Sequence, residues 1–216
     1  KFLSSPMGSD FASQNKEDYK IAKRIITISR EFGSGGRFIG EEVAKKLGIA
    51  YYDKEMIGQI AEQAGLSSAY VRENAELSPK KGWFAYAFSG RDITGKSVED
   101  MVYEAQRKVI MEIAEKENCV IVGRNADFIL KDRKDVLNVF IHGSIPEKVR
   151  RICSLYNVTE VDAIKMINDI DKRRRTNYNF YTEQKWGMAE NYTMSLNSSV
   201  LGYDLCQKII IDCAKL

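Results

Sequence analysis

Apolar and polar positions alternate along this chain in blocks that predict strands and helices in turn. A β-branched run at residues 24–29 precedes a glycine cluster at 33–36, and residues 38–47 then carry apolar side chains at helical spacing. Gly48 is expected to end this helix, and residues 49–52 are expected to form a second buried strand. Strands joined by a helical crossover run in the same direction, so this order predicts a parallel sheet.

Three further apolar runs complete the expected sheet, at residues 119–122, 136–141 and 209–211. Each of them follows a stretch with helical character. Five parallel strands with helices between them predict a three-layer α/β fold.

Two helical segments interrupt this alternation. The first covers residues 54–117 and contains an aromatic, glycine-bearing stretch around Trp83, and the second covers about 146–190 and begins with a highly charged part. Residues 23–216 are expected to form a single domain. Residues 1–22 are polar and lack periodicity, which predicts a disordered N-terminal segment or an expression remnant.

Composition narrows the class of function. The 216 residues are 44% hydrophobic, which is enough for one sizeable core. Lys and Arg number 33 against 30 Asp and Glu, so the net charge of +3 gives no global reason to expect a nucleic acid partner or an acidic membrane surface. Any site for an anion must therefore be local.

The cysteines and the apolar runs point to a reducing, aqueous compartment. The four cysteines lie far apart and share a single histidine, His142, so neither a zinc site nor a disulfide framework is expected. The same lone histidine leaves no Ser-His-Asp or Cys-His arrangement to assemble. With no run long enough to span a membrane and no secretory signal pattern, we expect a cytoplasmic protein.

The glycine cluster is the first candidate site, because it leaves a predicted strand and opens a predicted helix. Backbone N–H groups and the helix dipole favour an anion there. Phosphate loops follow the pattern G-x-x-x-x-G-K-[ST], and in that register the four defining places hold Arg30, Gly35, Gly36 and Arg37. Arg37, or Arg30 from the strand end, could replace the missing lysine, since a guanidinium matches phosphate oxygens. A tight turn with solvent-facing arginines is the alternative.

Two more candidates stand at strand ends. Arg124 follows the apolar run at 119–122 and would emerge at the carboxyl edge of the sheet, where open α/β sheets bind ligands. Asp53 closes the second strand, where a carboxylate could hold a substrate group or a metal-bound water. The alternatives are a surface arginine in a turn and an ordinary turn aspartate.

The charged second insertion supplies the last candidates. Asp171 and Arg174 are three apart on one helical face, and Arg151 lies upstream. A lid that closes over transferring phosphates needs such cations, whereas a solvated helix face is the simpler interpretation. Aromatic residues between 178 and 192 could stack on a base, and packing of a lid would explain them equally well.

Taken in order, these motifs resemble those of a known family. The matching segments are Ser29-Arg-Glu-Phe-Gly-Ser-Gly-Gly-Arg-Phe-Ile-Gly40, Tyr51-Tyr-Asp-Lys-Glu55, Val120-Ile-Val-Gly-Arg124, Asp171-Lys-Arg-Arg174, Lys185-Trp-Gly-Met-Ala-Glu-Asn-Tyr192 and Asn197-Ser-Ser199. The chain from about residue 23 onward resembles the cytidylate-kinase-like family. The resemblance implies a P-loop nucleoside monophosphate kinase fold, with a helical substrate-binding insertion and a helical lid. It also implies ATP with Mg²⁺ as the phosphoryl donor and CMP or dCMP as the acceptor.

The resemblance also implies roles for individual residues. The donor phosphates would lie on Gly33, Ser34, Gly35, Gly36 and Arg37, with Arg30 nearby. Arg124 would hold the phosphate or sugar of CMP, Asp171 and Arg174 would contact the nucleotide from the lid, and Arg151 would be a further lid cation. Arg37, Arg124, Arg151 and Arg174 would thus be the catalytic cations, Asp53 a further substrate-binding residue, and no side chain a direct metal ligand.

The chain departs from the family pattern at three places. Gly36 stands for the loop lysine, Arg37 for the loop serine, and Asn125 for the aspartate of a Gly-Arg-Asp segment. Three functions therefore stay open: a nucleoside monophosphate kinase, a nucleotide-binding regulatory module without turnover, and a kinase for another small molecule. A small nucleotide is the expected partner, and a homodimer is compatible with the sequence.

Overall fold

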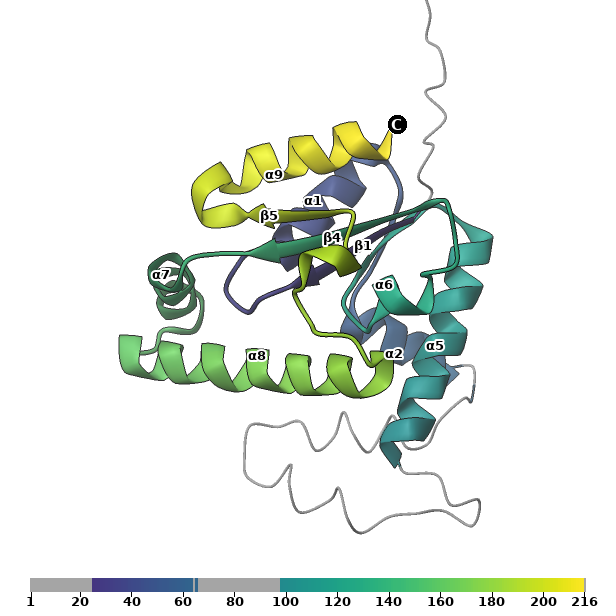
Figure 1. The fold of residues 1–216 in the computed structure, drawn as a ribbon, viewed down its shortest axis with the longest axis horizontal. Helices are drawn as coiled ribbons and strands as arrows, with labels where there is room; N and C mark the ends of the chain where they lie inside the picture. Colours follow the sequence, from purple (N-terminus) through teal and green to yellow (C-terminus); the bar gives the residue numbers. More distant parts are fainter. Residues whose placement is uncertain (1–24, 64, 66–97, 216) are drawn as a thin grey trace, which may run out of the picture.

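The computed structural model describes residues 25–63, 65 and 98–215, which form a sheet with helices on both faces (Figure 1). The strands are β1 (Ile25–Arg30), β2 (Ala50–Tyr52), β3 (Cys119–Val122), β4 (Val136–His142) and β5 (Met194–Asn197). The helices are α1 (Gly36–Leu47), α2 (Lys54–Gln63), α5 (Val98–Lys116), α6 (Ala126–Ile129), α7 (Ile145–Tyr156), α8 (Glu160–Thr182) and α9 (Ser198–Ala214), with a 3₁₀ helix η1 at Ala189–Asn191. The N-terminal segment and the stretch around Trp83 lie outside the described residues.

The sheet is parallel throughout, in the order β2-β3-β1-β4-β5. This confirms the predicted five-stranded α/β architecture. The central strand β1 is apolar on both faces at its start, as expected for a strand covered by helices on each side. All five strands point their carboxyl ends to the same edge, so the loops that follow them gather there.

The fifth strand was predicted in the wrong place. Residues 209–211 lie inside α9, and the strand that completes the sheet is β5, a short and partly polar segment just before that helix. In α9 the buried residues Cys206, Ile210 and Ala214 are four apart, which is the spacing of one helical face. A run of three isoleucines has neither the alternation of a half-buried strand nor a clear helical period, so it fits both.

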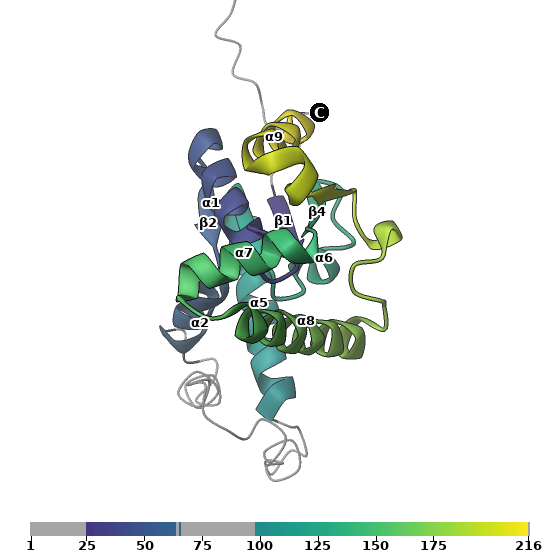
Figure 2. The same ribbon diagram turned by 90° about the vertical axis from the view of Figure 1, so that its left-hand side faces the viewer.

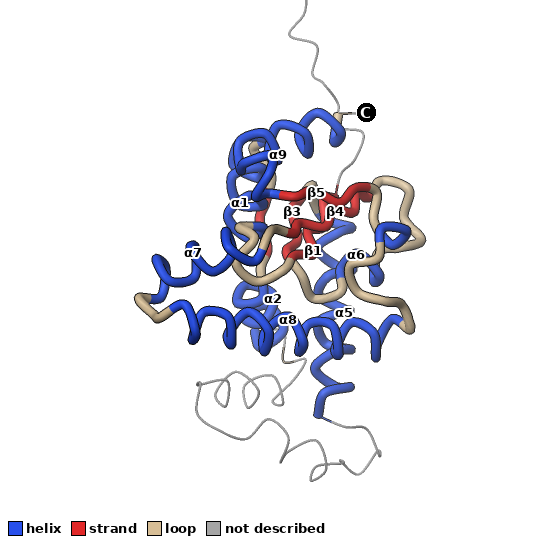
Figure 3. Tube along the Cα trace, turned by 60° about the vertical axis from the view of Figure 1, so that its left-hand side comes forward, coloured by secondary structure: helices blue, strands red, loops and turns tan. Residues whose placement is uncertain are grey.

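Helices α1 and α9 cover one face of the sheet, and α2, α5 and α6 cover the other (Figures 1 and 3). In α1 the buried residues Ile39 and Val43 are four apart and pack on the strands. Gly48, with φ 65°, ends that helix as predicted. The sheet is therefore packed between two apolar layers, one on each face.

The predicted lid segment forms a helical hairpin beside the carboxyl edge of the sheet (Figure 2). It is not continuous, because Asn157 adopts a left-handed conformation (φ 52°) that ends α7 before α8 begins. The two helices pack through a small apolar cluster of Val149, Ile152, Ala163 and Ile167. Among the described helices, none combines the length and the apolar character that crossing a membrane requires.

Candidate functional site

The glycine loop between β1 and α1 leaves an open helix N-terminus. Gly33 and Gly35 have φ of 85° and 80°, a conformation that favours glycine, and Gly35 provides α1 with no side-chain cap. The first amides of α1, at Gly36, Arg37 and Phe38, have no intrahelical carbonyl to donate to, and no other group in the described chain accepts from them. No acidic side chain lies in this first turn. The loop can therefore receive an anion.

A buried ion-pair cluster fixes this loop to the lid. Lys148 of α7 is 3% exposed, and its Nζ lies 3.0 Å from Glu31 Oε2 and 3.4 Å from Asp171 Oδ2. The other oxygen of Asp171 accepts the backbone N–H of Phe32 at 2.7 Å. Burial raises the pKa of Asp171, while the Phe32 N–H and the Lys148 cation act to lower it. The cluster thus ties the start of the loop to both lid helices.

Three arginines from different elements converge beside the loop. Arg30 ends β1, Arg124 follows β3, and Arg174 lies on α8. The Nη1 of Arg174 donates to the backbone carbonyl of Arg30 at 3.0 Å. Burial and, after it, the charges of Arg174 and Arg124 lower the pKa of Arg30 to about 9. The pKa of Arg174 is also lowered, first by burial. Within the described chain this cluster has one carboxylate in ion-pair range, Asp171 at 3.6 Å from Arg174 Nη1.

Backbone strain accompanies the middle arginine. Gly123, Arg124 and Asn125 have consecutive positive φ values of 80°, 58° and 55°. A left-handed conformation costs a residue such as arginine roughly 1–2 kcal/mol, and asparagine tolerates it better. Asn125 is buried and its Nδ2 donates to Asn177 Oδ1 at 3.3 Å, which ties this turn to α8. Such strain in a packed turn is typical of a site that must aim a side chain.

Arg37 turns outward from the loop. Its side chain is 62% exposed, and Nη2 lies 2.7 Å from Asp53 Oδ2. Asp53 is buried, and its Oδ1 accepts the N–H groups of Glu55 and Met56 at the start of α2. The adjacent Tyr51 hydroxyl is buried without a hydrogen-bond partner among the described residues. Asp53 therefore lies at the edge of the site, where it is paired with Arg37.

Arg151 of the lid contacts an aromatic side chain instead of the arginine cluster. Its Nη1 donates to the Tyr203 hydroxyl at 3.0 Å, and its guanidinium lies 5.1 Å from the centre of that ring. A Cβ at Gly35 would lie 2.6 Å from the same ring, and Phe38 packs against it at 5.8 Å between centroids. Tyr203 thus forms one wall of the glycine loop.

Sequence comparison decides the family. The cytidylate kinase-like family matches this chain over residues 25–200. The chain belongs to that family. Among curated protein sequences, none matches it.

Solved structures share the fold of this chain. An uncharacterized protein from Eubacterium ventriosum ATCC 27560 is 29% identical, with a TM-score of 0.69, over 88% of this chain and 97% of that chain. Shikimate kinase from Bacteroides thetaiotaomicron is 15% identical, with a TM-score of 0.51, over 89% of this chain and 98% of its own. The second likeness concerns the fold alone, which is that of the P-loop kinases.

The predicted site residues of this cytidylate kinase-like protein fall into three groups. Arg30, Arg124 and Arg174 come together at the sheet edge. The loop residues 33–36 lie beside them, with the Ser34 hydroxyl turned inward to donate to the Glu31 carbonyl at 2.8 Å. The remaining residues contact other protein groups: Arg37 and Asp53 pair with each other, Arg151 contacts Tyr203, and Asp171, beside Arg174, uses both oxygens inside the protein. Their contacts with a nucleotide stay predictions.

The fold family implies Mg²⁺, but the residues offer it no ligand set. Position 37 carries an arginine where the standard loop has a hydroxyl, and the buried acid Asp53 is paired with that arginine. Within the described ranges, no group of three or more His, Cys, Asp or Glu side chains could hold a metal ion. Among the described residues, the protein part of the site is therefore mainly cationic.

Sequence reasoning missed Lys148, Glu31 and Tyr203. A signal for Lys148 existed, because it lies in the buried stripe of α7 with Val149 and Ile152. A lysine at such a position is rarely buried without a partner. The partners themselves lie more than a hundred residues away or on another helix, and only the fold reveals them.

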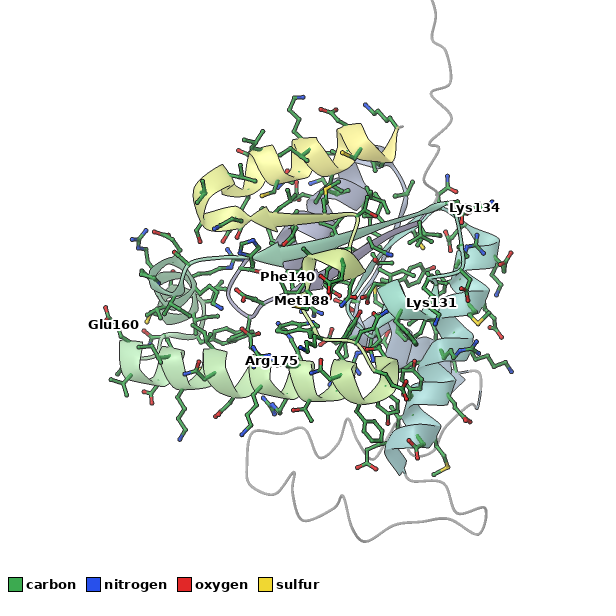
Figure 4. The ribbon with its side chains drawn as sticks, in the orientation of Figure 1. Lys131, Lys134, Phe140, Glu160, Arg175 and Met188 are labelled. Atoms are coloured by element: carbon green, nitrogen blue, oxygen red, sulfur yellow. The ribbon has the colours of Figure 1, made fainter. Side chains whose placement is uncertain are left out.

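The aromatic segment after α8 packs on the sheet. The Phe140 ring lies 5.3 Å from that of Trp186 and 5.0 Å from that of Tyr192, and Arg175 lies over Trp186 at 5.8 Å. Figure 4 shows Phe140 and Met188 between the sheet and α8. These contacts support lid packing, which was one of the two interpretations of this segment.

A buried acid lies behind the site. Asp127 of α6 is 3% exposed, and its Oδ2 accepts the Tyr178 hydroxyl at 2.8 Å. Burial raises the pKa of Asp127 above its ordinary 3.8, against the opposing effect of that hydrogen bond. The folded protein therefore binds the proton more tightly than the unfolded chain does. The contribution of Asp127 to stability is largest below pH 3.8 and is lost as pH rises through its folded pKa.

Asp127→Asn is expected to remove this pH dependence. The wild type should lose stability relative to the variant as pH rises from 4 to 8, because only the wild type must ionise a buried carboxyl. Urea unfolding at several pH values measures the difference, with Asp204→Asn, an exposed site on α9, as the control. A difference between wild type and Asp127→Asn that stays constant with pH would contradict the prediction.

Proposed function

We propose that this protein transfers the γ-phosphoryl group of ATP to a nucleoside monophosphate, with CMP or dCMP as the acceptor. The arginine cluster carries the proposal: three guanidinium groups at the sheet edge share one carboxylate, and that carboxylate also faces Lys148. At least two positive charges are left for a ligand. The phosphate of a nucleoside monophosphate is a dianion near neutral pH and matches them.

The chain supplies positioning and charge for this reaction. The free amides at the start of α1 would hold the donor phosphates, and the arginine cluster would hold the acceptor phosphate beside them. An acceptor oxygen would form the new bond to the γ-phosphorus while the bond to the β-phosphate bridging oxygen breaks, which gives ADP and a nucleoside diphosphate. Because the attacking oxygen is already ionised, no general base is needed. Mg²⁺ would accompany ATP on its phosphates.

A small nucleotide in the cytoplasm, bound by one domain over residues 23–216, is the simplest setting for the reaction. A binding module without turnover is the competing function, favoured by Gly36 and Arg37 in place of the loop lysine and hydroxyl. A kinase for a different small molecule is the third, favoured by Asn125.

Coupled ADP release across a panel of acceptors separates the three. With ATP and Mg²⁺, we expect turnover with CMP and dCMP that exceeds turnover with UMP, AMP and GMP. Cytidine and shikimate serve as acceptors without a phosphate, and a reaction without acceptor measures hydrolysis. Arg124→Ala should lower acceptor-dependent turnover about 100-fold or more, since a desolvated charge contact in the transition state is worth 10²–10³ in rate.

Turnover with cytidine or shikimate that matches CMP would favour a different small-molecule kinase. Nucleotide binding without turnover in folded protein would favour the binding module. Arg124→Ala must be compared at equal folded fraction, measured by thermal unfolding, because its backbone is strained. Alanine keeps the same strain, so the comparison isolates the side chain.

A further inference from the structure

Two positions of the glycine loop have exchanged their residue types. In the standard pattern the first place is glycine and the seventh is lysine, whereas here the first is Arg30 and the seventh is Gly36. A Cβ built at Gly36 would lie 2.6 Å from Arg30 Cβ and 3.0 Å from Arg30 Cγ. The stem of Arg30 therefore lies where a side chain at position 36 would begin. One space serves both positions and holds one side chain.

The Arg30 side chain runs from this space to the end of β3. Its Nη1 would lie 2.1 Å from a Cβ at Gly123, so the guanidinium lies directly against that glycine. Arg124 and Arg174 are the charged groups that act on it most strongly. The Arg30 side chain thus extends from the start of α1 to the turn that carries Arg124.

Among the cations around the loop, Arg30 differs in its partners. Arg37 pairs with Asp53, and Lys148 is neutralised by Glu31 and Asp171. For Arg30 no acidic side chain lies within ion-pair distance among the described residues, and burial holds its pKa near 9. The group is still protonated at neutral pH, but burial and the two neighbouring arginines disfavour its charge, and Tyr51 and Glu55 offset this only in part. An arriving anion would relieve that cost, which prepares Arg30 to bind one.

We propose that Arg30 contacts the transferring phosphoryl group in place of the loop lysine, and that the Arg30 and Gly36 pair is a functional exchange of the standard glycine and lysine. The proposal rests on the proposed kinase function. It assigns Arg30 to the reaction centre, where a guanidinium can contact two phosphate oxygens at once. It also explains why glycine stands at position 36, where the backbone conformation itself does not demand it.

The exchange is tested with single and paired substitutions. Arg30→Ala should lower kcat by about 10²–10³-fold, with a smaller change in the KM for CMP, because the lost contact belongs to the transition state. Arg30→Lys should recover part of that loss. Gly36→Lys alone should be impaired, since its Cβ meets the Arg30 stem. Arg30→Gly combined with Gly36→Lys restores the standard residues at these two positions and should exceed both Arg30→Gly and Gly36→Lys by at least about 10-fold in kcat.

Lys208→Ala, which removes an exposed cation on α9, is the matched control and should leave kcat unchanged. Thermal unfolding checks that each variant is folded. If Gly36→Lys does not fold, the double variant is compared with Arg30→Gly alone. An Arg30→Ala enzyme within about threefold of the wild type would overturn the role of Arg30, and a double variant no better than its single variants would overturn the exchange. Both results would leave the kinase function standing.

The kinase proposal can fail separately, through a wild type that turns over no acceptor. Arg30 is then tested by calorimetric titration with ATP alone. A loss of affinity of about 10-fold or more in Arg30→Ala, with none in Lys208→Ala, would support the phosphate contact. Equal affinity in all three proteins would overturn it.

Discussion

Lys148→Ala is expected to lower the free energy of unfolding by about 2–4 kcal/mol. Removing this cation leaves Glu31 and Asp171 facing each other without a counter-charge, and breaking a fully buried pair costs about 3–5 kcal/mol. We place the value lower because the Glu31 side chain is 27% exposed and water can screen part of its charge. Urea unfolding of both proteins at pH 7 measures the change.

The loss should depend on pH with a defined sign. The Lys148 cation helps to lower the pKa of Asp171, so the pKa of this carboxyl rises further in the variant. A raised folded pKa gives stability that is present at low pH and is lost as pH rises. The difference between Lys148→Ala and the wild type should therefore be larger at pH 8 than at pH 5. Lys208→Ala, at an exposed ion pair, should show almost no effect at either pH.

Arg174→Ala should have the largest effect on turnover of any lid substitution. We expect kcat to fall by about 10²–10³-fold, because the side chain places one of three converging charges and also holds the Arg30 carbonyl. Arg173→Ala, one residue earlier and exposed on the same helix, should stay within about threefold of the wild type. Steady-state ADP release under saturating ATP and CMP compares the two.

The neighbouring pair is a strict control because both variants lose one positive charge from the same turn of α8. Equal losses in the two would mean that the lid acts through its overall charge and not through this position. An unchanged kcat in both variants would mean that neither lid arginine takes part in the reaction. A loss confined to Arg174→Ala supports the geometry.

The fold could be predicted from sequence where a local pattern decides it. The run of β1, the glycine loop and α1 follow from β-branched residues, glycines and helical spacing in immediate succession. The fifth strand could not be placed, because β5 is short and partly polar and forms through its pairing with β4. The apolar run at residues 209–211 is compatible with both a buried strand and a buried helix. Tertiary pairing overrides local preference at such positions.

The site shows the same division. Arg30 ends β1 and Arg124 follows the neighbouring strand β3, so their meeting at one edge follows from a parallel sheet, and Arg174 joins them from α8. The pairing of Arg37 with Asp53 and of Lys148 with Glu31 could not be foreseen, since each depends on where two distant segments pack. Sequence therefore identifies which charges can gather, and packing determines which of them stay uncompensated.

Transfer of labelled γ-phosphate tests the central claim most directly. Protein is incubated with ATP labelled at the γ-position, Mg²⁺ and CMP, and the products are separated. We predict label in CDP, with little in free phosphate, and loss of labelled CDP in Arg124→Ala. Label that stays in ATP, or that appears only as free phosphate in folded wild-type protein, would contradict a nucleoside monophosphate kinase.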